Sequence, residues 1–181
     1  MILQWVPALS RPELLAAPVR SALEGMGQLA GVDPATIEVA EIDPDLADTA
    51  VLTEAIGGEL ADMANCIVVA GARTGEERVC AALVLGHTRA DVNKAIRKRL
   101  DVRKCSFMVM DEAVERTGME YGGITPVGLP EGWPVLVDSR VLEREHVIIG
   151  SGLRRSKLRL PGAHAALLPG AEVVEGLAVE V

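Results

Sequence analysis

The stretch CIVVAGARTGEERVCAALVL, from Cys66 to Leu85, contains the most regular pattern in the chain. Two apolar runs, Cys66–Ala72 and Arg78–Leu85, lie on either side of the polar, glycine-containing segment Arg73–Glu77. Short apolar runs separated by a few turn-forming residues are typical of a β-hairpin. The sequence therefore predicts two antiparallel strands joined by a turn in this stretch.

The segments around the hairpin predict helices and further short strands. Apolar residues at helical spacing predict helices at Arg11–Leu29, within Asp48–Ala64, and at Asp91–Leu100, Asp111–Thr117 and Ala163–Leu168. Short apolar runs predict strands at Ile37–Ile42, Cys105–Met110, Val135–Asp138, His146–Ile149 and Lys157–Leu160, and Val173–Val181 is expected to close the sheet. Asp91 and Asp111 are the expected N-caps of their helices. Gly31–Pro34 is expected to break the first helix, and the Gly- and Pro-rich segment Tyr121–Pro130 is expected to be a loop.

The order of these elements predicts the fold class. Helices and strands follow one another at uneven intervals, and no clean β-α-β repeat is present. This order indicates an α+β fold with a mixed, largely antiparallel sheet flanked by helices. The chain has 181 residues and no segment that reads as a long linker, so we expect one domain over residues 1–181.

Composition and charge narrow the class of partner. Apolar residues make up 49% of the chain and aromatics 2%, so the core must be aliphatic, and aromatic platforms for single-stranded nucleic acid are not expected. The net charge is −8, yet residues 89–104 hold seven basic and two acidic side chains, and residues 153–160 hold four basic and none acidic. Two basic patches on an acidic protein suit a polyanion held at one place. The alternative is that both runs are solvated surface.

Cysteine usage and the N-terminal sequence predict the compartment. The three cysteines, Cys66, Cys80 and Cys105, are far apart and form no CxxC or Cys/His cluster, which argues against a zinc site and for a reducing compartment. The start MILQWVPALSRPELL lacks the basic and apolar regions of a signal peptide. No run reaches the apolar length that a membrane span needs. We therefore expect a cytoplasmic protein without a membrane partner.

The loop from Tyr121 to Gly128, sequence YGGITPVG, is the most distinctive candidate site. Adjacent glycines let a ligand approach the backbone closely, and exposed N–H groups on a stiff loop suit an ester or carboxylate-like oxygen, as in an oxyanion hole. An ordinary Gly/Pro turn is the alternative. Ser151 lies between two glycines but lacks the strand–helix pattern of a nucleophile elbow.

Six segments in order resemble the YbaK/ProX family of aminoacyl-tRNA editing domains, which are free-standing or inserted in prolyl-tRNA synthetases. They are Val79–Leu85, Arg89–Lys94, Asp111–Gly118, Gly122–Gly128, Val135–Asp138 and Ile149–Gly152. The match covers about residues 60–178, and residues 1–60 fit it loosely. The Gly-x-x-x-Pro loop, here Gly122 to Pro126, is the family's specific mark.

The resemblance implies hydrolysis of the ester between a wrong amino acid and the 3′ acceptor end of tRNA, with no metal or other cofactor. It also implies association with an aminoacyl-tRNA synthetase. The implied catalytic residues are Asn65, Gly122, Gly123, Ile124, Thr125 and Pro126, and the implied substrate-binding residues are Asp138, Gly150, Ser151, Gly152 and His164. The basic patches make Lys94, Arg97, Arg154 and Arg155 the candidates for contact with tRNA, on one side of the pocket mouth.

Two positions depart from the family pattern. Family members usually carry a lysine where this chain has Asn65, and often an acidic residue where it has His164 or Ala163. Arg154 and Arg155 are candidate replacements for the lysine, because they follow the Gly150–Gly152 turn. Three functions therefore stay open: a trans-editing deacylase, a relative that binds aminoacyl-tRNA or a similar ligand without hydrolysis, and a hydrolase of small aminoacyl esters.

Overall fold

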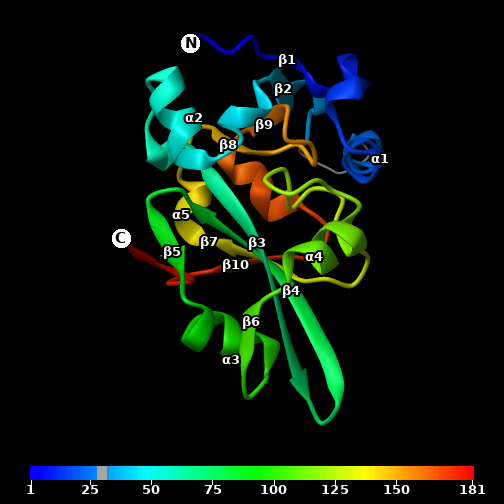
Figure 1. Cartoon of the computed structure of the whole chain (residues 1–181), viewed down its shortest axis with the longest axis vertical. Coiled ribbons are helices and arrows are strands. Elements are labelled where there is room, and N and C mark those ends of the chain that lie inside the picture. Colours follow the sequence, from blue (N-terminus) through cyan, green and yellow to red (C-terminus); the bar gives the residue numbers. More distant parts are fainter. Residues whose placement is uncertain (28–31) are drawn as a thin grey trace.

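A long hairpin forms the centre of the computed structural model, which describes residues 1–27 and 32–181. Strands β3 (Ala64–Arg73) and β4 (Glu76–Leu85) pair along their whole length, from Ala64 opposite Leu85 to Arg73 opposite Glu76 (Figure 1). Thr74 and Gly75 connect them with φ angles of 51° and 84°, the positive values that a two-residue hairpin turn requires. The predicted hairpin is confirmed, and both strands are longer than the apolar runs.

The strands of the described part of the chain form three sheets. The hairpin belongs to a five-stranded sheet of order β10-β7-β4-β3-β6, in which β7 (Val135–Asp138) is parallel to β4 and to β10 (Ala171–Val174), while β6 (Cys105–Phe107) is antiparallel to β3. An antiparallel four-stranded sheet has the order β1-β2-β9-β8, with β1 at Val6–Pro7, β2 at Glu38–Glu41, β9 at Ser156–Leu160 and β8 at Val147–Gly150. The last sheet pairs β11 (Ala178–Glu180) with β5 (Thr88–Ala90). The α+β class and the mixed, largely antiparallel pairing are confirmed.

Within residues 1–27 and 32–181, five α-helices and several shorter turns surround the sheets. The α-helices are α1 (Ala17–Met26), α2 (Thr49–Ile56), α3 (Arg97–Leu100), α4 (Met110–Thr117) and α5 (Ser139–Leu142). Turns of 3-10 helix lie at Ala8–Ser10, Pro12–Leu14, Pro34–Thr36, Pro44–Leu46, Leu60–Asp62 and Gly162–Leu167, and a π-helical turn at Val92–Ile96 leads into α3. No described helix combines the length and the apolar character that a membrane crossing needs.

Several predicted elements differ in their ends. The first helix begins at Ala17 and not at Arg11, because Leu15 is extended between the Pro12–Leu14 turn and α1. The predicted end of this helix at Leu29 and the start of the Gly31–Pro34 break lie outside the described residues. Asp111 is not an N-cap: Val109 holds that position in α4, and Asp111 lies in the first turn. The segment Val173–Val181 does not form one strand, because a turn at Gly176 (φ 69°) separates β10 from β11.

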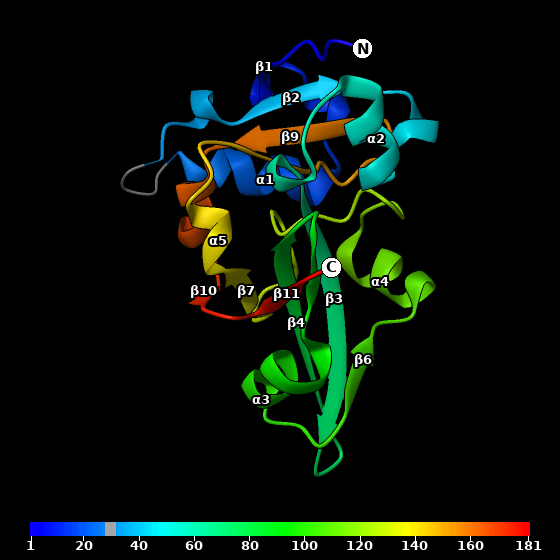
Figure 2. The same cartoon turned by 90° about the vertical axis from the view of Figure 1, so that its left-hand side faces the viewer.

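The largest core joins the N-terminal segment to the later part of the chain. Val19, Leu23 and Met26 of α1 are buried in the same cluster as Val137 of β7 and Leu158 of β9. Figures 1 and 2 show α1, α2 and the four-stranded sheet at one end of the molecule, while α3 and β6 lie toward the other end, along the hairpin. The first residues of β3 therefore lie where the two larger sheets approach each other, and an isolated bridge between Met63 and Ile148 connects them.

Candidate functional site

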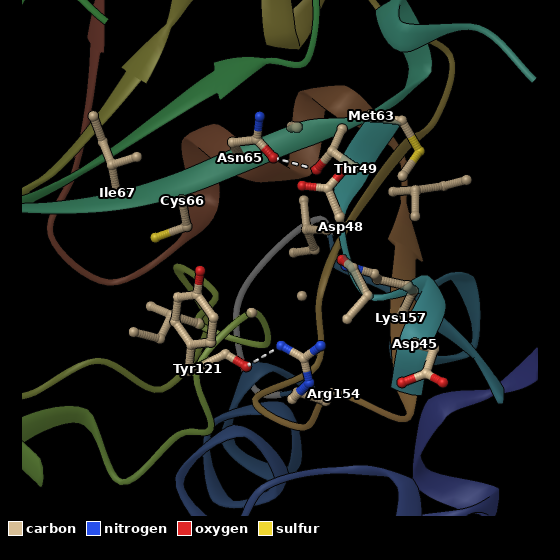
Figure 3. Close-up of a pocket in the computed structure, with 17 residues that line it drawn as sticks. Asp45, Asp48, Thr49, Met63, Asn65, Cys66, Ile67, Tyr121, Arg154 and Lys157 are labelled. Carbon is tan, nitrogen blue, oxygen red and sulfur yellow. Dashed lines mark hydrogen bonds between the residues drawn. The ribbon is translucent and has the colours of Figure 1, made fainter. Parts of the chain in front are cut away.

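A cavity of about 530 Å³ opens at this junction (Figure 3). Its walls come from the Pro44–Thr49 segment, the start of β3, the glycine loop, the end of β8 and the residues that follow it. The lining residues are Asp45, Ala47, Asp48, Thr49, Met63, Ala64, Asn65, Cys66, Ile67, Tyr121, Gly122, Ile124, Ile148, Ile149, Gly150, Arg154 and Lys157. The sequence-predicted residues Asn65, Gly122, Ile124, Gly150 and Arg154 therefore meet at one cavity.

Two glycine-containing segments form one wall by packing backbone against backbone. The N–H of Gly152 donates to the carbonyl oxygen of Gly123 at 2.8 Å. A Cβ on Gly150 would overlap the same carbonyl oxygen, and a Cβ on Gly123 would lie 2.7 Å from the backbone carbon of Leu153. Side chains are excluded at these positions because two main chains are in contact. Gly123 and Gly152 therefore support the wall and do not line the cavity.

Only part of the glycine loop faces the cavity. Gly123 N–H donates to Glu120 O at 2.9 Å, and Thr125 N–H points at the sulfur of Met119 at 3.5 Å, so both groups turn inward. Thr125 is fully buried, and Pro126 lines a separate groove beside Trp133. Tyr121, Gly122 and Ile124 are thus the three loop residues that line the cavity and that a ligand there could contact.

Asn65 is the second residue of β3 and lines the same cavity as Gly122, as the sequence led us to expect. Its amide oxygen accepts a hydrogen bond from the hydroxyl of Thr49 at 2.5 Å (Figure 3). Thr49 opens α2, whose N-terminus is capped by Asp48 through hydrogen bonds from Ala50 N–H (2.9 Å) and Val51 N–H (3.2 Å). Asn65 is therefore anchored to α2 and carries no charge into the cavity.

The buried cation of the cavity is Lys157, which sequence reasoning did not place among the site residues. Only 5% of Lys157 is exposed, and its Nζ donates to Ala47 O at 2.8 Å. Burial lowers its pKa from 10.5 to about 8; the charge of Asp48 opposes this change, and that of Arg154 adds to it. Part of the ammonium population is thus neutral at mildly alkaline pH.

The strand pattern explains why Lys157 was missed. Leu158 and Leu160 of β9 enter the core, so alternation puts Lys157 on the other face of the strand, where a lysine is normally exposed. The segment that ends in Ala47 covers that face. The signal available in the sequence was the basic run of residues 153–160, together with this alternation.

The two candidate arginines differ in position. Arg154 lines the cavity, and its guanidinium donates to Tyr121 O at 3.3 Å (Figure 3). It also donates to Pro44 O at 3.1 Å. Arg155 instead donates to Glu13 O at 2.5 Å and is not among the lining residues. Of the two expected replacements for the family lysine, only Arg154 is at the cavity.

Ser151 has a structural position. It is completely buried, and its hydroxyl lies 2.7 Å from that of Ser156, which donates to Leu14 O at 2.6 Å. These contacts tie the Gly150–Gly152 segment to the N-terminal part of the chain. The expectation that Ser151 contacts substrate is not supported by this placement.

Asp138 and His164 also lie apart from the lining residues. Asp138 is 1% exposed, pairs with Arg140 at 2.8 Å and accepts the N–H of Ala178 at 3.0 Å. Burial acts to raise its pKa, but the hydrogen bonds from Arg140 and Ala178 outweigh burial, so the pKa of Asp138 is lowered. His164 lies in the Gly162–Leu167 turn. Neither Asp138 nor His164, which were expected to contact substrate, is among the residues that line the cavity.

Lys94 and Arg97 do not lie at the cavity mouth. Lys94 belongs to the π-helical turn and Arg97 begins α3, and both views place α3 at the opposite end of the molecule from α2 (Figures 1 and 2). The expectation that the two basic patches flank one side of the mouth is therefore wrong. The sequence could not show this, because the hairpin carries the first patch away from the start of β3.

The cavity has charged and apolar walls but no cluster for a metal. Within residues 1–27 and 32–181, no group of three or more His, Cys, Asp and Glu side chains gathers at one point. Burial and the neighbouring Cys80 raise the pKa of the Cys66 thiol to about 12, so Cys66 is not a thiolate nucleophile near neutral pH. Asp45, Asp48, Lys157 and Arg154 supply charge, and the remaining wall is largely aliphatic. Such a cavity suits a ligand with polar groups at one end and a small apolar group at the other.

Comparison with known proteins assigns the family. The profile described as "Aminoacyl-tRNA editing domain" matches residues 43–166. A solved structure described as a candidate trans-editing enzyme for prolyl-tRNA synthetase has a TM-score of 0.71 and 25% identity, over 88% of this chain and 94% of that one. A hypothetical protein has a TM-score of 0.75 and 20% identity, over 90% of this chain and 99% of that one, and shows the fold alone. The resemblance to YbaK/ProX proteins is thus confirmed, and the chain belongs to the aminoacyl-tRNA editing domain family.

Proposed function

We propose that this protein is a trans-editing hydrolase that removes wrongly attached amino acids from the 3′ end of tRNA. The observation that carries the proposal is one cavity lined by the Gly122 backbone, Ile124 and the buried ammonium of Lys157, in a chain of the editing family. The reaction consumes one water and yields a free amino acid and a free ribose hydroxyl. No metal or other cofactor takes part in the proposed reaction.

The walls of the cavity match the parts of an aminoacyl ester. Asp45 and Asp48 would attract the α-ammonium group, which an amino acid keeps when its carboxyl group is esterified. The aliphatic wall, which includes Ile124 and Ile149, would contact an apolar side chain. The Gly122 segment would present backbone N–H to the ester carbonyl, as an oxyanion hole does. The vicinal ribose hydroxyl is the group that we propose to activate water.

A binding protein without hydrolysis is the second candidate. The observation that favours it is Asn65, a neutral residue whose amide is held by Thr49 where family members usually carry a lysine. In addition, no histidine is among the residues that line the cavity in the described part of the chain. This candidate predicts tight binding of aminoacyl-tRNA and no turnover.

Deacylation of a panel of misacylated tRNAs separates the candidates. The panel begins with tRNA(Pro) carrying small or aliphatic wrong amino acids, because a similar structure is described as a candidate trans-editing enzyme for prolyl-tRNA synthetase. Correctly charged tRNAs and free aminoacyl esters are the controls. Faster release from at least one misacylated tRNA supports editing. Binding without release on every member supports the second candidate, and hydrolysis of free esters alone supports a hydrolase of small aminoacyl esters.

A further inference from the structure

Lys157 is a buried cation with unused hydrogen-bonding capacity. An ammonium group has three donors, and the one hydrogen-bond partner of the Lys157 Nζ among residues 1–27 and 32–181 is Ala47 O, at 2.8 Å. Lys157 is also among the residues that line the cavity. Burial of an ammonium without a paired carboxylate is unfavourable for folding. A role in stability therefore does not explain this residue.

The charged groups around Lys157 do not neutralise it. Asp48 attracts it, but Oδ1 of Asp48 already accepts two N–H groups at the start of α2. Arg154, from the segment after β8, adds a like charge. The other titratable groups on the cavity wall are Asp45 of the Pro44–Leu46 turn, Cys66 of β3 and Tyr121 of the glycine loop. The surroundings of Lys157 are thus those of a cation that binds a ligand, and not those of one partner in a structural ion pair.

The backbone holds Lys157 in a fixed relation to the glycine loop. Lys157 is paired with Gly150 across the β8–β9 ladder. Gly150 touches the carbonyl oxygen of Gly123 so closely that a Cβ would not fit. These two contacts therefore fix the main chain of Lys157 relative to the loop that carries Gly122 and Ile124, and all three residues line one cavity. Donors fixed in this way can act on one oxygen atom without rearrangement.

We propose that Lys157 is a catalytic residue that donates a hydrogen bond from its ammonium group to the carbonyl oxygen of the aminoacyl ester. This inference rests on the proposed deacylase function. When water attacks the carbonyl carbon, a new C–O bond forms and the carbonyl electron pair moves to the oxygen, where Lys157 stabilises the negative charge. The ester C–O bond then breaks, its electron pair goes to the ribose oxygen, and that oxygen takes the proton released by the water.

The test compares Lys157→Met with Arg159→Met in single-turnover deacylation. Methionine keeps the unbranched length of lysine and removes the charge. Arg159 is on the same strand, pairs with Glu38 at 2.9 Å and is not among the lining residues, so its variant is a control for a lost positive charge. We expect Lys157→Met to slow the chemical step about 100-fold or more, as loss of one oxyanion donor does, and Arg159→Met to keep the wild-type rate. A thermal melt of each variant checks folding.

The pH profile identifies how Lys157 acts. If the ammonium form is required, the wild-type rate relative to that of Lys157→Met falls as the pH rises through the region of pH 8. A ratio that rises through that region overturns the proposal, because the neutral amine would then act as a base. An unchanged rate in a folded Lys157→Met protein also overturns it. If the wild type itself releases no amino acid from any tRNA in the panel, the proposed function fails, and this inference fails with it.

Discussion

Replacing Lys157 by methionine should change stability in a pH-dependent way. The pKa of Lys157 falls from 10.5 in a solvated chain to about 8 in the folded protein. At about 1.36 kcal/mol for each pH unit, this difference costs the folded state about 3 kcal/mol at neutral pH. Methionine removes that cost but leaves Ala47 O without its partner, which costs about 1–3 kcal/mol. We therefore expect Lys157→Met to be as stable as the wild type at pH 7, or more stable by up to about 2 kcal/mol.

The sign of the pH dependence follows from proton binding. Because the folded pKa is the lower one, the unfolded chain binds more protons than the folded protein between about pH 8 and 10.5. The cost of Lys157 is therefore complete below pH 8 and disappears as the pH rises toward 10.5. The stability of Lys157→Met minus that of the wild type should fall by about 1–1.5 kcal/mol between pH 7 and pH 9.

Urea unfolding at pH 7, 8 and 9 measures this difference. Subtracting the wild-type value at each pH cancels the titration of the groups that the substitution leaves unchanged. For the control Arg159→Met, this difference should not change over the same pH range. A difference for Lys157→Met that does not depend on pH would refute the reasoning, because Lys157 would then be an ordinary solvated lysine. So would a loss of more than about 3 kcal/mol at pH 7, because the ammonium would then stabilise the fold as a buried ion pair does.

Three further predictions test the glycine loop, the distal patch and Asn65. Gly123→Ala should lower the free energy of unfolding by about 1–3 kcal/mol in urea titrations, because its Cβ would lie 2.7 Å from the Leu153 backbone; an unchanged midpoint would contradict the close packing. Removing Lys94 and Arg97 together should leave deacylation of a minimal acceptor-stem substrate unchanged, and should lower the salt dependence of full tRNA binding only if the tRNA body reaches α3. A slower reaction on the minimal substrate would contradict their placement. Asn65→Lys should not speed the wild type in single-turnover assays, because a second ammonium would enter the cavity, but it should partly restore Lys157→Met; a gain in the wild type would contradict this.

Local patterns were enough to predict most of the fold. The hairpin, a helix within Asp48–Ala64 and β7 at Val135–Asp138 follow from apolar runs and from helical spacing. The elements that were missed are short. Examples are β5 and the four-residue α5. Asp138 caps α5 by accepting a hydrogen bond from the N–H of Arg140. Segments of three or four residues contain too few side chains to show a period.

The candidate site was predictable only in part, because tertiary packing decides which side chains reach it. The loop order identified Gly122 and Ile124, but it could not show that Thr125 and Pro126 turn away. The order of segments also led to the prediction that Asp138 belongs to the site. In the structure its carboxylate instead accepts hydrogen bonds from the Arg140 guanidinium and from the N–H of Ala178. These are contacts between distant parts of the chain, and no local pattern contains them.

The neutral residue at position 65 and the buried cation at position 157 have one physical explanation. The family resemblance leads to the expectation of a lysine at the head of β3, where this chain has an amide bound by Thr49. Lys157 of β9 lines the same cavity. Two ammonium groups in one poorly solvated cavity would each favour loss of the other's proton. A chain that holds Lys157 in this position therefore has a reason to keep a neutral residue at 65. For the same reason, the missing lysine at 65 is weak evidence against hydrolysis.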